Sequence, residues 1–321
     1  MFSKIAIRNI PSQIFRALET LADLHDRSTE AEARQALRAW VEPLLVQDSR
    51  NTRRKEVAER LNRMLTQVNS GQRGTKLTPS HIAEAIKEER AEDVEDWFLG
   101  EKEPSFPQLS AIASFLGVDS DWLKHGDKTL YPPAYERLSE NPFEAVDWLL
   151  SWDLADNQSD DGKLKTLHLI RADNPTGGLY MVKESDKGHF RTFYTPIHVS
   201  EEIGAGGEAS LAALFVTLEL LYKRYTAMGN GIMVLGYQLR PDDIAQLTNG
   251  NTHPGSLLKE GSRSMWWEDI WDSEMAPKHN YWPGWKSLYE RIERVISART
   301  HLNELRTQIR QGATTMARSD K

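Results

Sequence analysis

Two different hydrophobic periods follow one another near the start of the chain. Between Lys4 and Arg8, isoleucines alternate with polar or small residues, and a period of two is typical of a β-strand with one buried face. A strand of this length is not stable by itself in water, and no neighbouring segment has the pattern of a partner strand. We therefore expect it to pair with the same strand of a second chain.

Two helices are predicted after this strand. Pro11 and Ser12 end the strand and open the first helix. The segment His25–Arg27 predicts a turn, and Thr29 with Glu32 predicts a capping box at the start of the second helix. The apolar positions at helical spacing are Ile14, Phe15, Leu18, Leu21 and Ala22 in the first helix, and Ala33, Leu37, Trp40, Val41 and Leu44 in the second.

A strand, a helix and a capped helix in this order resemble the ribbon-helix-helix DNA-binding fold of the Arc/MetJ type. The segments Ile7–Asn9 and Arg27–Glu32 are most similar to those of antitoxins that partner VapC-type toxins. The resemblance covers residues 1–46. It implies that two chains intertwine and that their paired strands enter the major groove as a two-stranded ribbon.

The resemblance also assigns DNA contacts by position. Lys4, Ala6 and Arg8 would face the groove, and Arg8 is the strongest base reader because a guanidinium can bridge two acceptors of guanine. Phosphates would be held at the start of the second helix, where backbone amides are free to donate. The residues expected at this phosphate site are Arg27, Ser28, Thr29 and Glu30. The alternative is an ordinary edge strand on a helical domain.

A basic linker is predicted next, over Gln47–Lys55, because this segment has no apolar face. Its cations would either follow the DNA backbone or simply be solvated. The three that we consider as auxiliary DNA contacts are Arg53, Arg54 and Lys55.

A helical domain is predicted over residues 56–126, with helices beginning near Val57, Leu77 and Ala91 and two more between Glu103 and Leu123. It resembles the phage-repressor-like (Xre/Cro) helix-turn-helix family. The residues that carry this resemblance are Leu77, Thr78, Ile82, Ala83, Val94, Trp97, Gly100, Pro104, Ser105 and Leu116–Val118.

The recognition helix of this second module departs from the family pattern, because it is acidic. It contains Glu92, Asp93, Glu95 and Asp96, and phosphates repel carboxylates. Three interpretations stay open: a surface that binds protein, a structural dimerisation domain, or a helix-turn-helix that touches DNA through a few flanking cations. Those cations are Lys87, Arg90 and Lys102.

The last part of the chain, residues 141–321, predicts an α+β domain that resembles no family we recognise. Strands are expected at 164–170, 178–182, 190–195 and 232–237, with a helix over Glu208–Tyr225. We expect a flexible loop at Gly204–Gly207. A long helix after Pro283 would pair either with another chain or with its own domain.

A dense group of tryptophans in this domain predicts either a core or a ligand pocket. The residues considered as a ligand pocket are Trp266, Trp267, Trp271 and Trp282. Histidines His168, His189 and His198 do not have the spacing of a metal site. No catalytic motif is visible, so we expect neither an enzyme nor a cofactor.

Charge and composition refine this picture. The chain has no cysteine, no apolar signal segment and a net charge of −7, which fits a cytoplasmic protein without a membrane partner. The first 75 residues contain 13 Lys or Arg and nine Asp or Glu, so they carry +4 and the remainder carries −11. A nucleic-acid interface is therefore expected at the N-terminal end.

These observations predict a multidomain, mainly α protein with an N-terminal ribbon-helix-helix, a central helix-turn-helix and an α+β C-terminal domain for sensing or oligomerisation. The main hypothesis is a transcriptional regulator of the repressor type that binds double-stranded DNA as a homodimer or higher homo-oligomer. The alternative is an antitoxin-type protein that neutralises a protein partner and autoregulates its operon. An enzyme with a DNA-targeting appendage is a third, less favoured class.

Overall fold

The computed structural model describes residues 7–71, 74–152, 162–227 and 231–315. The chain forms two compact units, one from residues 1–59 and 96–103 and the other from 60–95 and 104–321. It passes from one unit to the other within two of its helices, α2 (Thr29–Gly71) and α4 (Ala91–Leu99). The three-domain division expected from the sequence stays a prediction.

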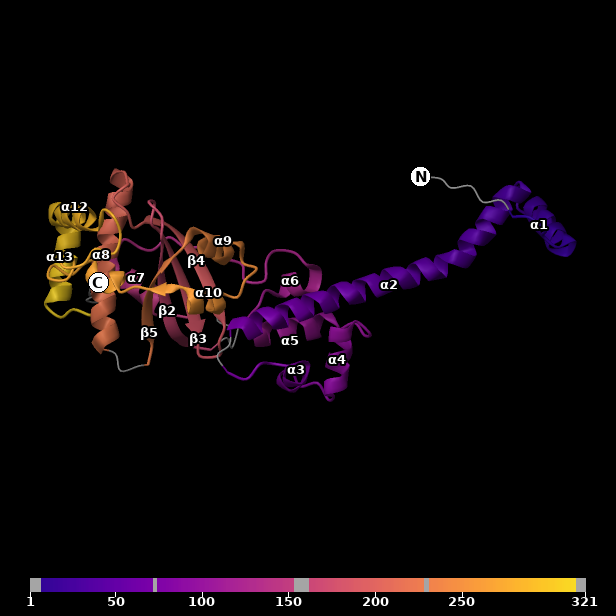
Figure 1. Cartoon of the computed structure of the whole chain (residues 1–321), viewed down its shortest axis with the longest axis horizontal. Coiled ribbons are helices and arrows are strands. Elements are labelled where there is room, and N and C mark those ends of the chain that lie inside the picture. The colour runs from indigo at the N-terminus through magenta and orange to yellow at the C-terminus, as the bar shows by residue number, and fades with distance from the viewer. Residues whose placement is uncertain (1–6, 72–73, 153–161, 228–230, 316–321) are drawn as a thin grey trace, which may run out of the picture. The chain divides into compact units, whose positions relative to one another are not determined.

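The first unit is helical in its described part. Helix α1 (Ser12–Leu24) confirms the first predicted helix, and α2 runs without interruption for 43 residues. The separate helix expected to begin near Val57 is therefore wrong, because α2 already runs through this position, whereas the linking role of Gln47–Lys55 stays a prediction. The predicted linker is helical throughout (Figure 1). It contains no glycine or proline, and arginine, lysine and glutamine have high helix propensity even without an apolar face.

The second unit begins with short helices that confirm those predicted from the sequence. They are α3 (Pro79–Ala85), α5 (Phe106–Leu116) and α6 (Ser120–His125). Ser105 and Gln108 form a capping box at the start of α5, and Gly117 ends this helix with a left-handed φ of 64°. Whether these helices work as a helix-turn-helix stays a prediction.

The predicted α+β part is confirmed as a mixed sheet flanked by helices (Figure 1). Its six strands follow the order β1-β4-β3-β2-β5-β6. The central three are antiparallel neighbours, whereas β5 is parallel to β2 after a crossover through α8. The strands are β1 (Ala134–Tyr135), β2 (Leu164–Ala172), β3 (Gly178–Ser185), β4 (Phe190–His198), β5 (Met233–Leu239) and β6 (Ser262–Arg263). The helices are α7 (Pro142–Leu149), α8 (Ala205–Ala227), α9 (Pro241–Asn249), α10 (Pro254–Glu260), α11 (Trp266–Asp269), α12 (Trp285–Ala298) and α13 (Thr300–Arg310).

Helix α8 is the centre of the larger hydrophobic core. Its apolar residues pack with those of α7, α12 and α13, and with one face of the sheet. Among the described helices it alone has the length and composition to cross a membrane, but most of its residues are buried within this core. The loop predicted at Gly204–Gly207 is wrong from Ala205 onward, because α8 already begins there.

The tryptophan cluster is part of the same core. Trp266 and Trp267 are fully buried, and Trp271 and Trp282 are nearly so. The core interpretation therefore holds, and among the described cavities none is lined by these four side chains. The predicted long helix is broken at Arg299 into α12 and α13. Its apolar face is buried within its own domain, so the interchain helix pair is wrong.

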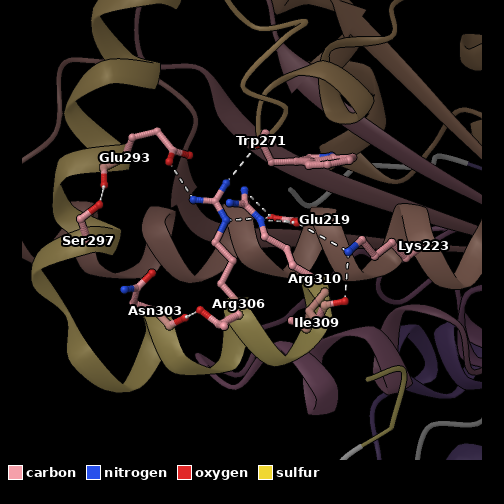
Figure 2. A network of polar contacts seen from close by, with 10 residues as sticks. Glu219, Lys223, Trp271, Glu293, Ser297, Asn303, Arg306, Ile309 and Arg310 are labelled. Atoms are coloured by element: carbon pink, nitrogen blue, oxygen red, sulfur yellow. Dashed lines mark hydrogen bonds and ion pairs between the residues drawn. The ribbon is translucent and has the colours of Figure 1, made fainter. Parts of the chain in front are cut away.

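A buried ion network fastens α13 to α8 (Figure 2). Arg306 donates to Glu219 at 2.7 Å, to Glu293 at 2.8 Å and to the carbonyl oxygen of Trp271 at 3.0 Å. Arg310 donates to the other oxygen of Glu219 at 2.8 Å. Burial lowers the pKa of Arg306, but its carboxylate partners more than offset this, so the guanidinium stays charged.

Glu219→Ala should lower the free energy of unfolding of the second unit by about 3–5 kcal/mol, because it leaves Arg306 buried without its main partner. The measurement is chemical denaturation followed by circular dichroism. Asp243→Ala is the matched control, since it breaks an exposed pair with Arg240 and should cost less than about 1 kcal/mol. Equal effects of the two variants would contradict the buried network.

A second buried cation lies beneath α7. The Nζ of Lys183 donates to the carbonyl oxygens of Trp148 and Ser151 and lies 3.7 Å from the centroid of the Trp148 ring. Burial, only partly offset by Glu136, lowers the pKa of Lys183 from 10.5 to about 7.

Stability should therefore rise as the pH increases from about 7 to about 10.5, because in this range the unfolded chain holds a proton on Lys183 that the folded chain has lost. In Lys183→Met this contribution should disappear. Urea denaturation at a series of pH values measures the difference between the two proteins. Parallel pH profiles for both would show that the folded state keeps this amine charged.

Candidate nucleic-acid interface

The groove-reading residues expected from the sequence lie at the edge of the described chain. Lys4 and Ala6 fall outside the described residues, as does most of the predicted strand. Arg8 is exposed, in an irregular stretch that leads into α1. The side chain of Arg8 is thus available to solvent.

The apolar positions of α1 and α2 form an exposed face in the single chain. Among the apolar side chains that the sequence predicted to be inside, Ala22 is the only buried one whose exposure the structure describes, and Leu44 lies outside the described side chains. Trp40 is 78% exposed, Leu24 is 76% exposed and Ile14 is 57% exposed. The other large apolar side chains that are exposed here are Ile7, Ile10, Phe15, Leu21, Leu37 and Val41. Exposed apolar side chains at this density are typical of an interface.

The turn between α1 and α2 has a different N-cap from the predicted one. Helix α2 begins at Thr29, so its N-cap is Ser28, whose hydroxyl accepts from the amide of Ala31 at 3.2 Å. Glu32 does not complete a capping box, because its carboxylate lies 2.9 Å from Nδ1 of His25 and 3.6 Å from Arg27. The Thr29 capping box is therefore wrong, and Glu32 instead ties the turn to α2.

The predicted phosphate site is partly occupied by these contacts. Arg27 is directed toward Glu32, although its side chain is 46% exposed. Ser28 and Glu30 are exposed at the first turn of α2, where the helix dipole favours an anion. The carboxylates of Glu30 and Glu32 lie in that same turn and oppose a phosphate. The amides of Ser28, Thr29 and Glu30 stay predicted contacts.

The auxiliary cations are divided between paired and solvent-facing positions. Arg53 lies 2.7 Å from Glu103, and Lys102 lies 2.9 Å from Asp96. Arg54 donates to the carbonyl oxygen of Glu101. The other three, Lys55, Lys87 and Arg90, are exposed. In the acidic helix α4, Glu92 and Glu95 are also exposed. DNA phosphates would repel these carboxylates if the helix entered a groove.

The three histidines considered as metal ligands each make a hydrogen bond to a different residue. His168 lies 3.4 Å from Glu184, His189 contacts the carbonyl oxygen of Phe115, and His198 contacts that of Thr176. Within the described part of the chain, no group of three or more potential ligands could hold a metal ion.

Comparison with known proteins identifies the N-terminal segment. Residues 4–41 match the family model of the antitoxin FitA-like ribbon-helix-helix domain. Over 41 residues the chain is 44% identical to a plasmid stability protein, y4jJ, of Sinorhizobium fredii (strain NBRC 101917 / NGR234). This match covers 13% of the chain and 48% of that protein, so the chain spans about half the length of this relative. No solved structure matches the chain.

The ribbon-helix-helix resemblance is therefore confirmed for the N-terminal segment. The relationship of the second module to the Xre/Cro family stays a prediction, and so do its DNA contacts.

Ser28→Ala should lower the stability of the first unit by about 1 kcal/mol, because it leaves an amide of the first turn without its partner. Thr29→Ala is the control and should have little effect, since Thr29 is already inside the helix. The measurement is hydrogen exchange of the Ala31 amide, because fluorescence would report on all ten tryptophans of the chain together. A larger effect of Thr29→Ala than of Ser28→Ala would instead support Thr29 as the N-cap.

Proposed function

We propose that this protein is a dimeric DNA-binding regulator whose N-terminal ribbon-helix-helix module reads its operator. The observation that carries the proposal is the agreement between the family match over residues 4–41 and the exposed apolar face of α1 and α2. A fold in which two chains share one core leaves such a face open in a single chain. The same family match supports both DNA binding and dimerisation.

The proposed dimer follows from the hydrophobic effect. Burial of apolar surface contributes about 25 cal/mol per Å², and large side chains such as Phe15, Leu37 and Trp40 leave much of their surface in water. A second copy would cover them with the same residues in a symmetric interface. Dimerisation would also give the strand predicted around Lys4–Arg8 a partner.

The proposed DNA contacts follow from the ribbon geometry. Lys4, Ala6 and Arg8 of each chain would face the major groove, and Arg8 would donate to guanine. The first turn of α2 would contact a phosphate through its amides. The second module and the α+β domain would contribute oligomerisation, partner binding or sensing, with repression as the regulatory outcome.

An antitoxin function is the alternative, and one observation favours it. The matching family is described as antitoxin-like, and the relative is described as a plasmid stability protein. In this case the chain would bind and neutralise a protein partner, and DNA binding would serve autoregulation. Co-purification of a small protein partner from the native host, in a fixed ratio to the chain, would support this alternative.

Arg8→Ala should relax the sequence preference of the full chain at the base pair that Arg8 contacts, because a bidentate contact to guanine contributes about 1–3 kcal/mol of discrimination. The measurement is selection from a pool of random DNA duplexes, with sedimentation to verify that the dimer is retained. Arg16→Ala is the matched control, since it removes an exposed arginine from α1. If Arg8→Ala selected the same operator as the parent, the ribbon assignment would be wrong.

A further inference from the structure

The second unit contains a cavity of about 410 Å³ on the face of the sheet that points away from α8. Thr166 and His168 of β2 line this cavity, whereas Leu167 and Leu169 pack in the core around α8. Successive side chains of a strand point to opposite faces. The cavity is therefore separate from the tryptophan core, and its volume is within the range typical of small-molecule sites.

The floor of the cavity is formed by side chains that the strand register places on one face of the sheet. Thr166 of β2 lies opposite Glu184 of β3 and Met233 of β5. Arg263 of β6 lies opposite Tyr237 of β5. Directly opposed side chains of neighbouring strands share a face, and so do Met233 and Tyr237, which are four residues apart in one strand. All five line the cavity, so its floor is one continuous surface.

Helix α10 forms another wall, and His253 fixes its position. The Nδ1 of His253 accepts from the amide of Gly255 at 3.0 Å, and the amide of His253 donates to Oε1 of Gln67 in α2 at 3.0 Å. A Cβ on Gly255 would lie 2.9 Å from the ring of Phe190 in β4, so the helix packs closely on the sheet. The wall is thus organised before any ligand arrives, which favours binding.

Burial lowers the pKa of His253 from 6.5 to about 4. Its imidazole is therefore neutral near pH 7 and adds no charge to the cavity. The charge of the wall comes from lysine, arginine and glutamate side chains.

Four cationic side chains from four different segments line the cavity and are exposed. They are Lys165 of β2, Lys187 of the turn between β3 and β4, Lys259 of α10 and Arg263 of β6. Among the described residues of the wall, Glu184 is the one carboxylate, and it lies 3.4 Å from Nζ of Lys165. The wall thus has a formal excess of three positive charges, although residues 76–321 together carry −11.

This charge selects the class of ligand. A cleft lined by one sign of charge concentrates ions of the opposite sign, and lysine ammonium groups bind phosphate as point charges. A phosphate ester carries about two negative charges at neutral pH, whereas a carboxylate carries one, so a phosphate offsets the excess more fully. The exposed apolar side chains of Phe115 and Met233 also line the cavity and offer contacts to an organic group.

We propose that this cavity binds a small organic phosphate. The cations of the wall would attract the phosphate group, and the organic part would contact the apolar side chains of Phe115 and Met233. This site does not depend on DNA binding by the N-terminal module.

The test uses phenyl phosphate as the probe, titrated calorimetrically into the full chain at neutral pH and low salt. The parent protein should bind it and should melt at a higher temperature in its presence. Arg263→Gln should weaken binding about fivefold, because a unit charge next to the ligand contributes about that much in water. Arg240→Gln is the matched control, since it removes an exposed arginine of the same unit that does not line the cavity.

Glu184→Gln separates an effect of charge from an effect on structure. Loss of this carboxylate should strengthen binding of phenyl phosphate about fivefold, whereas damage to the wall would weaken it. Phenol, which has the ring but no phosphate, should bind the parent at least tenfold more weakly than phenyl phosphate.

Four results would each overturn the proposal. They are failure of the parent to bind phenyl phosphate, unchanged binding by Arg263→Gln, unchanged or weaker binding by a folded Glu184→Gln, and equal binding of phenol and phenyl phosphate. Binding of the probe at the first turn of α2 would be unchanged in both cavity variants, so it is distinguished from binding in the cavity.

Discussion

The burial of α8 is the constraint on which the larger unit depends. This helix is apolar on nearly every side, so the sheet must cover one face while α7, α12 and α13 cover the rest. Glu219 is the one carboxylate in its buried stretch, and burying it is costly unless it is paired. Arg306 and Arg310 meet this need, and in doing so they fix where α13 lies.

The N-terminal module differs from this unit, because its apolar side chains are exposed. Its two helices leave Ile14, Leu24 and Trp40 in water, and two helices of this kind do not enclose a core between them. Such a module is complete only when something else covers the face. This is why the family match over residues 4–41 and the pattern of exposure both support the proposed dimer.

Within the second unit, one close contact joins the short helices to the sheet at Gly117 and His189. The Nε2–H of His189 donates to the carbonyl oxygen of Phe115 at 3.1 Å, and a Cβ at Gly117 would lie only 2.6 Å from the His189 ring. Glycine is therefore required there by space as well as by its left-handed φ.

The sequence by itself determined the elements with strong local signals. The helical periods of α1 and α5, the alternation of β2 to β4 and the ribbon-helix-helix signature follow from neighbouring residues, and all were predictable. Tertiary structure decided what local patterns cannot specify. The tryptophans entered the core because the side chains that cover them come from segments far away in sequence. Glu32 turned to His25 across the turn between α1 and α2 instead of capping the helix.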